Sequence, residues 1–335
     1  MKPVIYGLSG LELSADERSF FREADPLGYI LFKRNVADRA QLRALTDSLR
    51  ALSGRADLPI LIDQEGGKVA RMQPPEWPAF PAGPRFDALY EVAPASAIEA
   101  ARANAQAIAL TLAEVGITVD CLPLLDVRVP ETTPAVGERT LGSDPMRVAA
   151  LGRAILEGLR RGGVVGVVKH MPGHGRAVVD SHYELPVVHA DDAALERDIA
   201  PFRTLKAAPM GMTAHVVYTA WDAERPATLS PTVIRDVIRG RIGFDGLLMT
   251  DDIDMKALSG TAGEKAVAAI AAGCDVVLDC WGRMDEMAEI AGLLGEIAPA
   301  SRARLDWAMA TLAVGREEAE FEALIAKRDA LLALA

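Results

Sequence analysis

Five side chains that can transfer protons or hold ligands lie close together in one short stretch of this 335-residue sequence. An apolar run ends at Lys169 and His170, a loop with two glycines and a proline carries His174, and Asp180 and His182 follow. Three of the five histidines therefore fall within thirteen positions. Because imidazole changes charge near neutral pH and also binds metals, this stretch predicts either proton transfer or a metal site.

Asp180 and His182 have the spacing of a proton-transfer pair. In an extended segment, residues two apart point the same way, so the carboxylate can accept a hydrogen bond from one imidazole nitrogen. That bond fixes the tautomer and makes the other nitrogen a better base. The alternative is a turn in which the aspartate binds the backbone and the histidine is exposed to solvent.

Titratable groups also end five of the apolar runs in the sequence. A parallel barrel carries its active site at the carboxyl ends of its strands, so these groups are expected on one face. A partly buried carboxylate at a rigid strand end, such as Asp251, suits a nucleophile at an anomeric carbon. Taken singly, each aspartate could instead cap the helix that follows it. The five strand ends are Asp63, Lys169–His170, His215, Asp251–Asp252 and Asp279.

Eight short apolar runs alternate with amphipathic stretches along the chain. The runs are rich in β-branched residues and lack an alternating pattern, as expected of parallel strands buried on both faces. Eight such units predict an α/β fold, a (β/α)8 TIM-type barrel. The predicted strands are 3–7, 28–33, 59–64, 117–122, 164–169, 210–215, 246–251 and 275–280.

Helical patterns separate these runs. Apolar residues recur every three or four positions in 37–52 and 146–161, and a third helix is predicted over about 95–115. From about residue 285 the chain is rich in Ala, Leu and Glu, which predicts helices packed on the barrel. No linker and no repeat beyond the βα unit divides the sequence. We therefore expect residues 1–335 to form a single catalytic barrel domain.

Composition limits the class of partner. Half of the residues are hydrophobic and a quarter are charged, as in a globular protein. The net charge of −11 argues against binding to nucleic acid or to an anionic membrane. Cys121, Cys274 and Cys280 form no CxxC pair, which predicts buried free thiols in a reducing compartment. Since the N-terminus lacks the apolar core of a signal peptide, we expect a cytoplasmic protein.

Cationic and aromatic side chains near the strand ends suit the binding of a sugar. Lys169, Arg71 and Arg139 can hold hydroxyl or acidic groups, although an isolated arginine more often forms a surface ion pair. Three tryptophans in loops on the same side could stack on a sugar ring or pack within their loops. They are Trp77, Trp221 and Trp281.

The motifs around these residues resemble those of the family 3 glycoside hydrolases, in their single-domain bacterial branch of β-N-acetylhexosaminidases. The most specific are KHMPGHG followed by DSH, in order with DQEGG and TDD. Met171 stands where the family usually has phenylalanine. The matching stretches are GYILFKRN (28–35), IDQEGGKVARM (62–72), LPLLDV (122–127), GERTLGSDP (137–145), KHMPGHG (169–175), DSHYELP (180–186), MTAHVVY (212–218) and GFDGLLMTDDIDM (243–255).

The resemblance implies a role for each candidate site residue. Asp251 corresponds to the catalytic nucleophile, His182 to the acid/base and Asp180 to the partner of His182. Larger family members place the acid/base on a second domain, whereas here it falls in the loop 171–185, which we expect to be mobile. Five further residues correspond to those that hold the terminal N-acetylglucosamine: Asp63, Arg71, Arg139, Lys169 and His170.

The resemblance also implies a substrate and a setting. This branch of the family is cytoplasmic and acts in peptidoglycan recycling. It releases N-acetylglucosamine from fragments that carry anhydro-N-acetylmuramic acid, with or without a stem peptide. We therefore expect a retaining, exo-acting β-N-acetylglucosaminidase that is a monomer. Its partner would be a small carbohydrate, with no cofactor, metal, nucleic acid or membrane involved.

Alternative functions remain open from the sequence. A phosphorylase or a β-glucosidase would use the same site. A metal-dependent barrel hydrolase would bind zinc through His170, His174, His182, His215 and Asp180, although their spacing fits no standard ligand pattern. A non-enzymatic sugar-binding relative is disfavoured because a nucleophile and an acid/base are both present.

Overall fold

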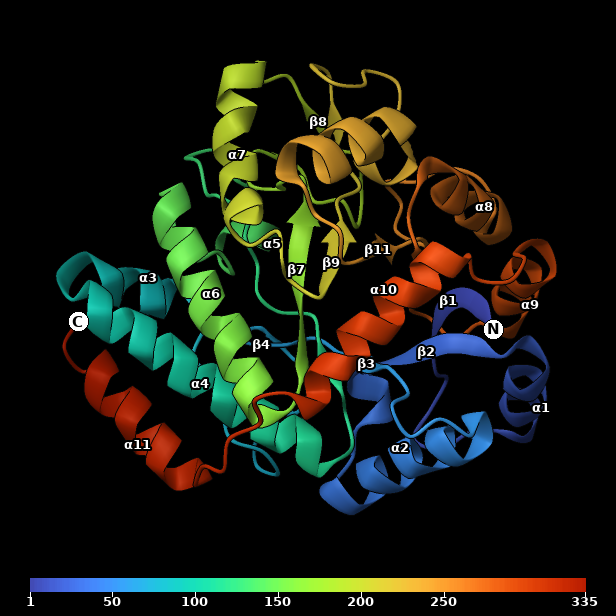
Figure 1. Cartoon of the computed structure of the whole chain (residues 1–335), viewed down its shortest axis with the longest axis horizontal. Coiled ribbons are helices and arrows are strands. Elements are labelled where there is room, and N and C mark those ends of the chain that lie inside the picture. The colour runs from blue at the N-terminus through green and yellow to red at the C-terminus, as the bar shows by residue number, and fades with distance from the viewer.

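The computed structural model describes all 335 residues, and its centre is a closed barrel of eight parallel strands (Figure 1). Each predicted run supplies one strand, which confirms the predicted (β/α)8 barrel. Around the barrel the order is β1-β12-β11-β9-β7-β6-β3-β2. The strands are β1 (Lys2–Gly7), β2 (Pro26–Leu31), β3 (Ile60–Ile62), β6 (Val119–Asp120), β7 (Val165–Met171), β9 (Met210–Thr213), β11 (Leu247–Asp252) and β12 (Val276–Asp279).

Helices surround the barrel, and those predicted over 37–52, 95–115 and 146–161 are α2, α4 and α6. The α-helices are α1 (Ala15–Ala24), α2 (Arg39–Ser53), α3 (Gly83–Val92), α4 (Pro94–Glu114), α5 (Pro134–Gly137), α6 (Pro145–Gly162), α7 (Asp192–Thr204), α8 (Ala262–Ala272), α9 (Met284–Leu293), α10 (Pro299–Ala310) and α11 (Phe321–Leu332). The other helical segments are η1 (Lys33–Asn35), η2 (Ala227–Leu229), η3 (Val233–Ile242) and η4 (Thr311–Ala313).

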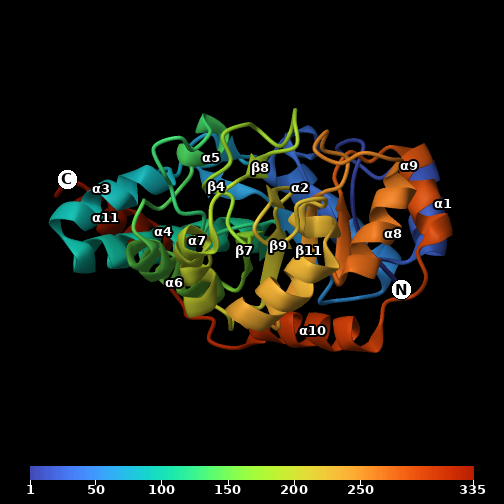
Figure 2. The ribbon, with the colours of Figure 1, turned by 90° about the horizontal axis from the view of Figure 1, so that it is seen from above.

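Two small sheets lie in the loops at the carboxyl ends of the barrel strands. One is an antiparallel hairpin of β4 (Gln64–Gly66) and β5 (Val69–Ala70), which directly follows β3. The other pairs β8 (Val187–Val188) with β10 (Val217–Tyr218) in parallel. In Figure 2, β4 and β8 lie above the barrel and α10 runs along its opposite side. The loops that could build a site are therefore gathered at one end.

Local signals set the ends of the predicted helices. Asp38 caps α2 by accepting the backbone N–H of Gln41, and Gly54 ends the helix with φ of 69°. Asp144 caps α6 in the same way. These caps fix where each helix begins, and so how long each βα loop can be.

The lumen of the barrel is filled with apolar side chains. They come from alternate residues of most strands, such as Val165 and Val167 of β7 or Leu247 and Met249 of β11. Side chains of α10, among them Leu305, belong to the same cluster and close the amino-terminal end of the barrel. Because this end is closed, only the carboxyl end of the lumen is available to a ligand.

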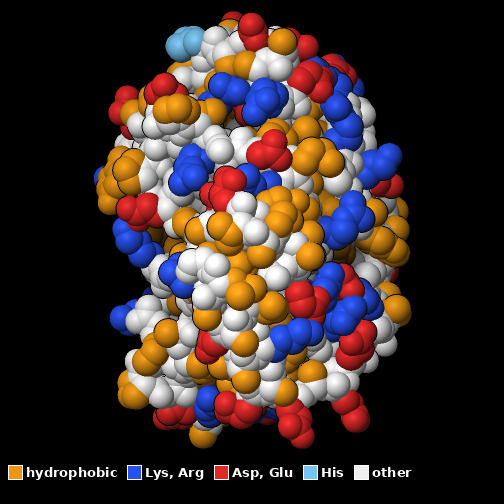
Figure 3. Space-filling model, turned by 90° about the vertical axis from the view of Figure 1, so that its left-hand side faces the viewer, with side chains coloured by type: hydrophobic (Ala, Val, Ile, Leu, Met, Phe, Trp, Pro, Cys, Tyr) orange, Lys and Arg blue, Asp and Glu red, His pale blue; other side chains and the backbone are white.

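The cysteines, the helices and one face of the surface can be compared with what the composition predicted. All three cysteines are free and buried, as predicted. None of the helices combines the length with the apolar character needed to cross a bilayer. On the face that carries α3, α4, α6 and α11, acidic and basic side chains are intermixed rather than separated by sign (Figure 3).

Candidate active site

A cavity of about 340 Å³ opens at the carboxyl ends of the barrel strands. Its walls come from segments that are far apart in the sequence, including β2, β7, β11 and the loop after β12. The structure therefore brings together the eight residues to which the family resemblance assigned a role. These are Asp63, Arg71, Arg139, Lys169, His170, Asp180, His182 and Asp251.

Strand geometry explains why three of these side chains point into the cavity. Successive residues of a strand point to opposite faces, so a polar residue two positions after a lumen residue also faces the lumen. Leu61, Val167 and Met249 lie in the lumen cluster. Asp63, Lys169 and Asp251 follow them by two positions and form the next layer of the lumen, at the floor of the cavity.

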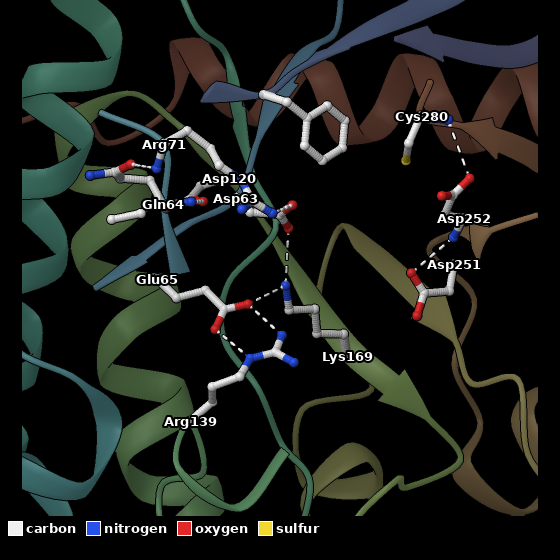
Figure 4. A network of polar contacts seen from close by, with 12 residues as sticks. Asp63, Gln64, Glu65, Arg71, Asp120, Arg139, Lys169, Asp251, Asp252 and Cys280 are labelled. Carbon is white, nitrogen blue, oxygen red and sulfur yellow. Dashed lines mark hydrogen bonds and ion pairs between the residues drawn. The ribbon is translucent and has the colours of Figure 1, made fainter. Parts of the chain in front are cut away.

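A buried network of ion pairs forms one side of this floor (Figure 4). The Lys169 ammonium lies 3.2 Å from Asp63 and 2.6 Å from Glu65. Arg71 donates to Asp63 at 2.9 Å, and Arg139 donates two hydrogen bonds to Glu65, at 2.6 and 2.9 Å. Only 2% of the Lys169 side chain is exposed, so these pairs are largely shielded from water. The network fixes three cations at the edge of the cavity.

The charges in this network stabilise one another. Burial alone would raise the pKa of Asp63, but Lys169 and Arg71 hold it well below its ordinary value. Burial likewise opposes ionisation of Lys169, and the two carboxylates nevertheless raise its pKa. Glu65 was not among the predicted site residues. Its signal was its place beside Asp63 in the DQEGG motif.

The hairpin β4–β5 places Arg71 beside Asp63. The Gln64 side chain accepts the backbone N–H of Arg71 at 2.9 Å, which holds the end of the hairpin against its start. The turn needs glycine, because Gly66 and Gly67 have φ of 98° and 59°. A side chain at Gly66 would also collide with the backbone that follows Phe80.

Asp126 holds the histidines of the KHMPGHG motif and was not predicted as a site residue. Its side chain is fully buried. One carboxylate oxygen lies 2.8 Å from Nδ1 of His170, and the other accepts the backbone N–H groups of His170 and His174. Burial opposes its ionisation, but these groups lower the pKa of Asp126 to about 2. His174 is kept neutral, because burial and the neighbouring His170 lower its pKa to about 4.

Asp251 lies at the end of β11 and faces the cavity. Its carboxylate accepts the backbone N–H of Asp252 at 2.8 Å. Burial opposes its ionisation, yet His170, His215 and that N–H together hold the pKa of Asp251 below its ordinary value. The neighbouring Asp252 also lines the cavity, and burial followed by the charge of Asp251 raises its pKa to about 6.

Asp180 and His182 form a hydrogen-bonded pair in the loop between β7 and β8. Nδ1 of His182 lies 2.8 Å from an oxygen of Asp180, as the predicted pairing requires. The local backbone differs from the prediction, because the segment is a turn rather than extended. The same oxygen accepts the backbone N–H of His182, and the N–H of Tyr183 bonds to the Asp180 carbonyl. The His182 side chain is 64% exposed, so it lies at the rim of the cavity.

Two of the five predicted strand-end groups do not line the cavity. Val276 and Leu278 of β12 and the following Cys280 face the lumen, so Asp279 points outward, where burial raises its pKa to about 7. In β9, Met210 and Met212 face the lumen, and His215 lies in the wall behind the cavity. There its Nε2 donates to the carbonyl of Asp252 at 2.9 Å.

The three tryptophans also differ from one another. Trp77 is buried in the core, and Trp221 packs against Tyr218 outside the cavity. Trp281 lines the cavity. The histidines and Asp180 suggested for a zinc site do not converge, since no three His, Cys, Asp or Glu side chains of the chain are placed to hold a metal ion.

These features define a class of protein. Carboxylates, cations and an Asp–His pair surround one pocket at the strand ends of an eight-stranded parallel barrel, which is typical of barrel enzymes that act on small polar substrates. The sequence places the chain within that class. The model of the glycosyl hydrolase family 3 N terminal domain matches residues 10–312. The chain therefore belongs to glycosyl hydrolase family 3, as its motifs predicted.

Proteins similar over nearly the whole chain carry related names. A β-hexosaminidase of Aromatoleum aromaticum is 38% identical over 312 residues, which cover 91% of this chain and 86% of the relative. A β-hexosaminidase of Chromobacterium violaceum is 37% identical, covering 98% of this chain and 91% of the relative. The solved structure of NagZ from Neisseria gonorrhoeae with N-trifluoroacetyl-D-glucosamine has a TM-score of 0.88 and 30% identity. It covers 99% of this chain and 98% of NagZ.

Proposed function

We propose that this chain is a retaining, exo-acting β-N-acetylglucosaminidase that releases terminal N-acetylglucosamine from cell-wall muropeptide fragments. The observation that carries the proposal is the single cavity that gathers a strand-end carboxylate, an Asp–His pair and a network of paired polar groups. Its volume of about 340 Å³ is in the range of small-molecule sites. The names of the relatives, and the glucosamine analogue bound to NagZ, support the identity of the sugar.

Asp251 is the proposed nucleophile. Its lowered pKa favours the ionised carboxylate at neutral pH, and the N–H of Asp252 holds one oxygen in place. The free oxygen attacks the anomeric carbon as the bond to the leaving oxygen breaks. A glycosyl ester with inverted configuration forms on Asp251.

His182 is the proposed acid/base. Its Nδ1 is bound to Asp180, which leaves Nε2 free to reach the substrate. The imidazolium gives its proton to the leaving oxygen in the first step. The neutral imidazole then takes a proton from water, which attacks the anomeric carbon, releases Asp251 and restores the β configuration.

The buried network and His170 are proposed to hold the terminal sugar. Lys169 and the arginines can donate to sugar hydroxyls with hydrogens that their carboxylate partners leave free. Because these cations are already fixed by ion pairs, little side-chain entropy is lost when the sugar binds. Those residues are Asp63, Arg71, Arg139, Lys169 and His170.

The biological setting is part of the same proposal. The fragments would carry anhydro-N-acetylmuramic acid, with or without a stem peptide, and the enzyme would act in the cytoplasm as a monomer during peptidoglycan recycling. Buried free thiols at Cys121, Cys274 and Cys280 are compatible with a reducing compartment.

One assay tests the sugar, the acceptor and the nucleophile together. Aryl N-acetyl-β-glucosaminide and aryl β-glucoside are offered with and without phosphate to the wild type, to Asp251→Ala and to Asp47→Ala, which removes an exposed carboxylate of α2. We expect turnover of the N-acetylated substrate without phosphate. Asp251→Ala should lower kcat by about a thousandfold or more, and Asp47→Ala should not.

The first-formed product decides the mechanism. NMR of the released sugar should show the β anomer first. A first product in the α configuration would remove the nucleophilic role from Asp251. Turnover that requires phosphate would make the enzyme a phosphorylase, and preference for the glucoside would make it a β-glucosidase.

A further inference from the structure

Trp281 presents an exposed aromatic surface inside the candidate active site. It lies in the short loop between β12 and α9, directly after the lumen residue Cys280. Its side chain lines the same cavity as Asp251 and His182. Trp281 is 50% exposed to solvent. A large apolar ring with this much exposed surface in a polar pocket is available to a ligand.

The indole ring is held in place by its neighbours. Its Nε1 donates to Asp252 at 3.1 Å, and the Arg283 and Arg34 guanidinium groups lie 5.2 and 5.9 Å from the ring centroid. Arg34 is itself fixed by hydrogen bonds to the carbonyls of Leu8 and Cys280. A ring whose orientation is set before binding loses little entropy when a ligand stacks on it.

The side chains at the floor of the cavity are less exposed to solvent than those at its rim. At the floor, the side chains of Lys169 and Asp63 are 2% and 15% exposed. At the rim, His182 is 64% exposed. In the proposed function the acid must touch the leaving oxygen, so the bond that breaks lies between floor and rim. The sugar on the leaving side of that bond then lies at the rim, where Trp281 is the exposed indole.

We propose that Trp281 is the platform on which the leaving sugar stacks, so that it forms a subsite for a pyranose ring beyond the scissile bond. The proposal rests on the proposed function and adds a specificity-determining residue to it. The C–H groups on one face of a pyranose pack against the indole, while the ring hydroxyls stay in water. Such a contact favours a sugar over a small leaving group, without selecting one linkage or one substituent.

The test compares two leaving groups on the full-length chain. The substrates are N,N′-diacetylchitobiose, whose leaving group is a sugar, and N-acetyl-β-D-glucosaminyl fluoride, whose leaving group is a single atom. The variants are Trp281→Ala, Trp281→Phe and the control Trp307→Ala. Trp307 is 49% exposed but lies on α10, at the closed end of the barrel, so its loss removes an equally exposed indole far from the cavity.

The ratio of kcat/KM for the disaccharide to that for the fluoride is the readout. In Trp281→Ala this ratio should fall about tenfold, mainly through a higher KM for the disaccharide, which is the effect of losing roughly one good aromatic contact. Trp281→Phe keeps an aromatic ring, so its ratio should fall less. Trp307→Ala should keep the wild-type ratio.

The other outcomes overturn the proposal. An unchanged ratio in Trp281→Ala would show that the leaving sugar does not use the indole. An equal fall for both substrates would assign Trp281 to the terminal sugar or to the cavity wall. A wild type that cleaves the fluoride but not the disaccharide overturns this inference alone, whereas a wild type that cleaves neither overturns the proposed function as well.

Discussion

Replacing Asp126 with asparagine should lower the free energy of unfolding by about 2 kcal/mol at pH 7, because its buried carboxylate stabilises the fold only when ionised. The carboxylate binds the ring of His170 at 2.8 Å and the backbone N–H groups of His170 and His174. These contacts lower its pKa from an ordinary 3.8 to about 2, against the effect of burial. One pKa unit corresponds to about 1.4 kcal/mol, which gives the predicted loss.

The pH dependence follows from the direction of this shift. The pKa of Asp126 is lower in the folded chain than in the unfolded chain, so its stabilising effect is complete above about pH 4. It disappears as the pH falls toward 2. The difference between wild type and Asp126→Asn should therefore be about half as large at pH 3 as at pH 7. Urea unfolding at both pH values measures it.

Asp198 provides a matched control, because its ionisation is expected to have the opposite effect on stability. It is equally buried, but burial raises its pKa to about 6 despite its ion pair with Arg176. Since ionisation of Asp198 disfavours folding above pH 4, Asp198→Asn should raise the free energy of unfolding at pH 7, by up to about 3 kcal/mol. Equal losses in the two variants, or a loss at Asp126 that stays constant down to pH 3, would refute the reasoning.

Three further changes probe the rest of the site. Asp180→Asn removes a negative charge 2.8 Å from His182. In a solvent-exposed pair this charge is worth about 1.5 kcal/mol, so kcat should fall about tenfold for poor leaving groups and less for good ones. An equal fall for both kinds of leaving group would contradict the pairing. Lys169→Met leaves two buried carboxylates without their shared cation, so it should lower the free energy of unfolding at pH 7, measured in urea, by about 3 kcal/mol or more. The loss should be smaller at pH 3, where carboxylates can take up protons. Gly175→Ala should lower the Tm, because its new Cβ would lie 1.9 Å from a backbone carbonyl oxygen, whereas Gly10→Ala meets no atom within 4 Å and should leave the Tm unchanged.

The strand ends show what the sequence can predict and where it fails. Apolar runs located all eight strands, and strand periodicity carries Asp63, Lys169 and Asp251 into the lumen. Asp279 and His215 were predicted on the same face because they also end apolar runs, and that prediction was wrong, since neither lines the cavity. A parallel strand that is apolar on both faces has no alternating polarity, so its sequence does not say which residues face inward. That choice depends on how each strand is staggered against its neighbours.

The partners of the site residues were harder to find than the residues themselves. Glu65 and Asp126 hold Lys169 and His170, but each pair joins segments more than forty positions apart. Nothing in the local composition shows which buried carboxylate will meet which cation. The Asp180–His182 pair was predictable because both partners lie in one turn, and even there the structure has a turn where extended backbone was predicted.

The proposed mechanism needs a nucleophile that is ionised and an acid that is protonated at the same pH. Two neighbouring carboxylates oppose this arrangement, because each charge raises the pKa of the other. Asp252 illustrates the effect, since burial and then the charge of Asp251 raise its pKa to about 6. Imidazoles act in the opposite direction: His170, His215 and His182 all lower the pKa of Asp251 and so oppose the effect of its burial. A histidine acid therefore favours the ionised nucleophile while it carries its proton. Once it has given that proton to the leaving group, it is a neutral base beside a glycosyl ester that no longer carries charge.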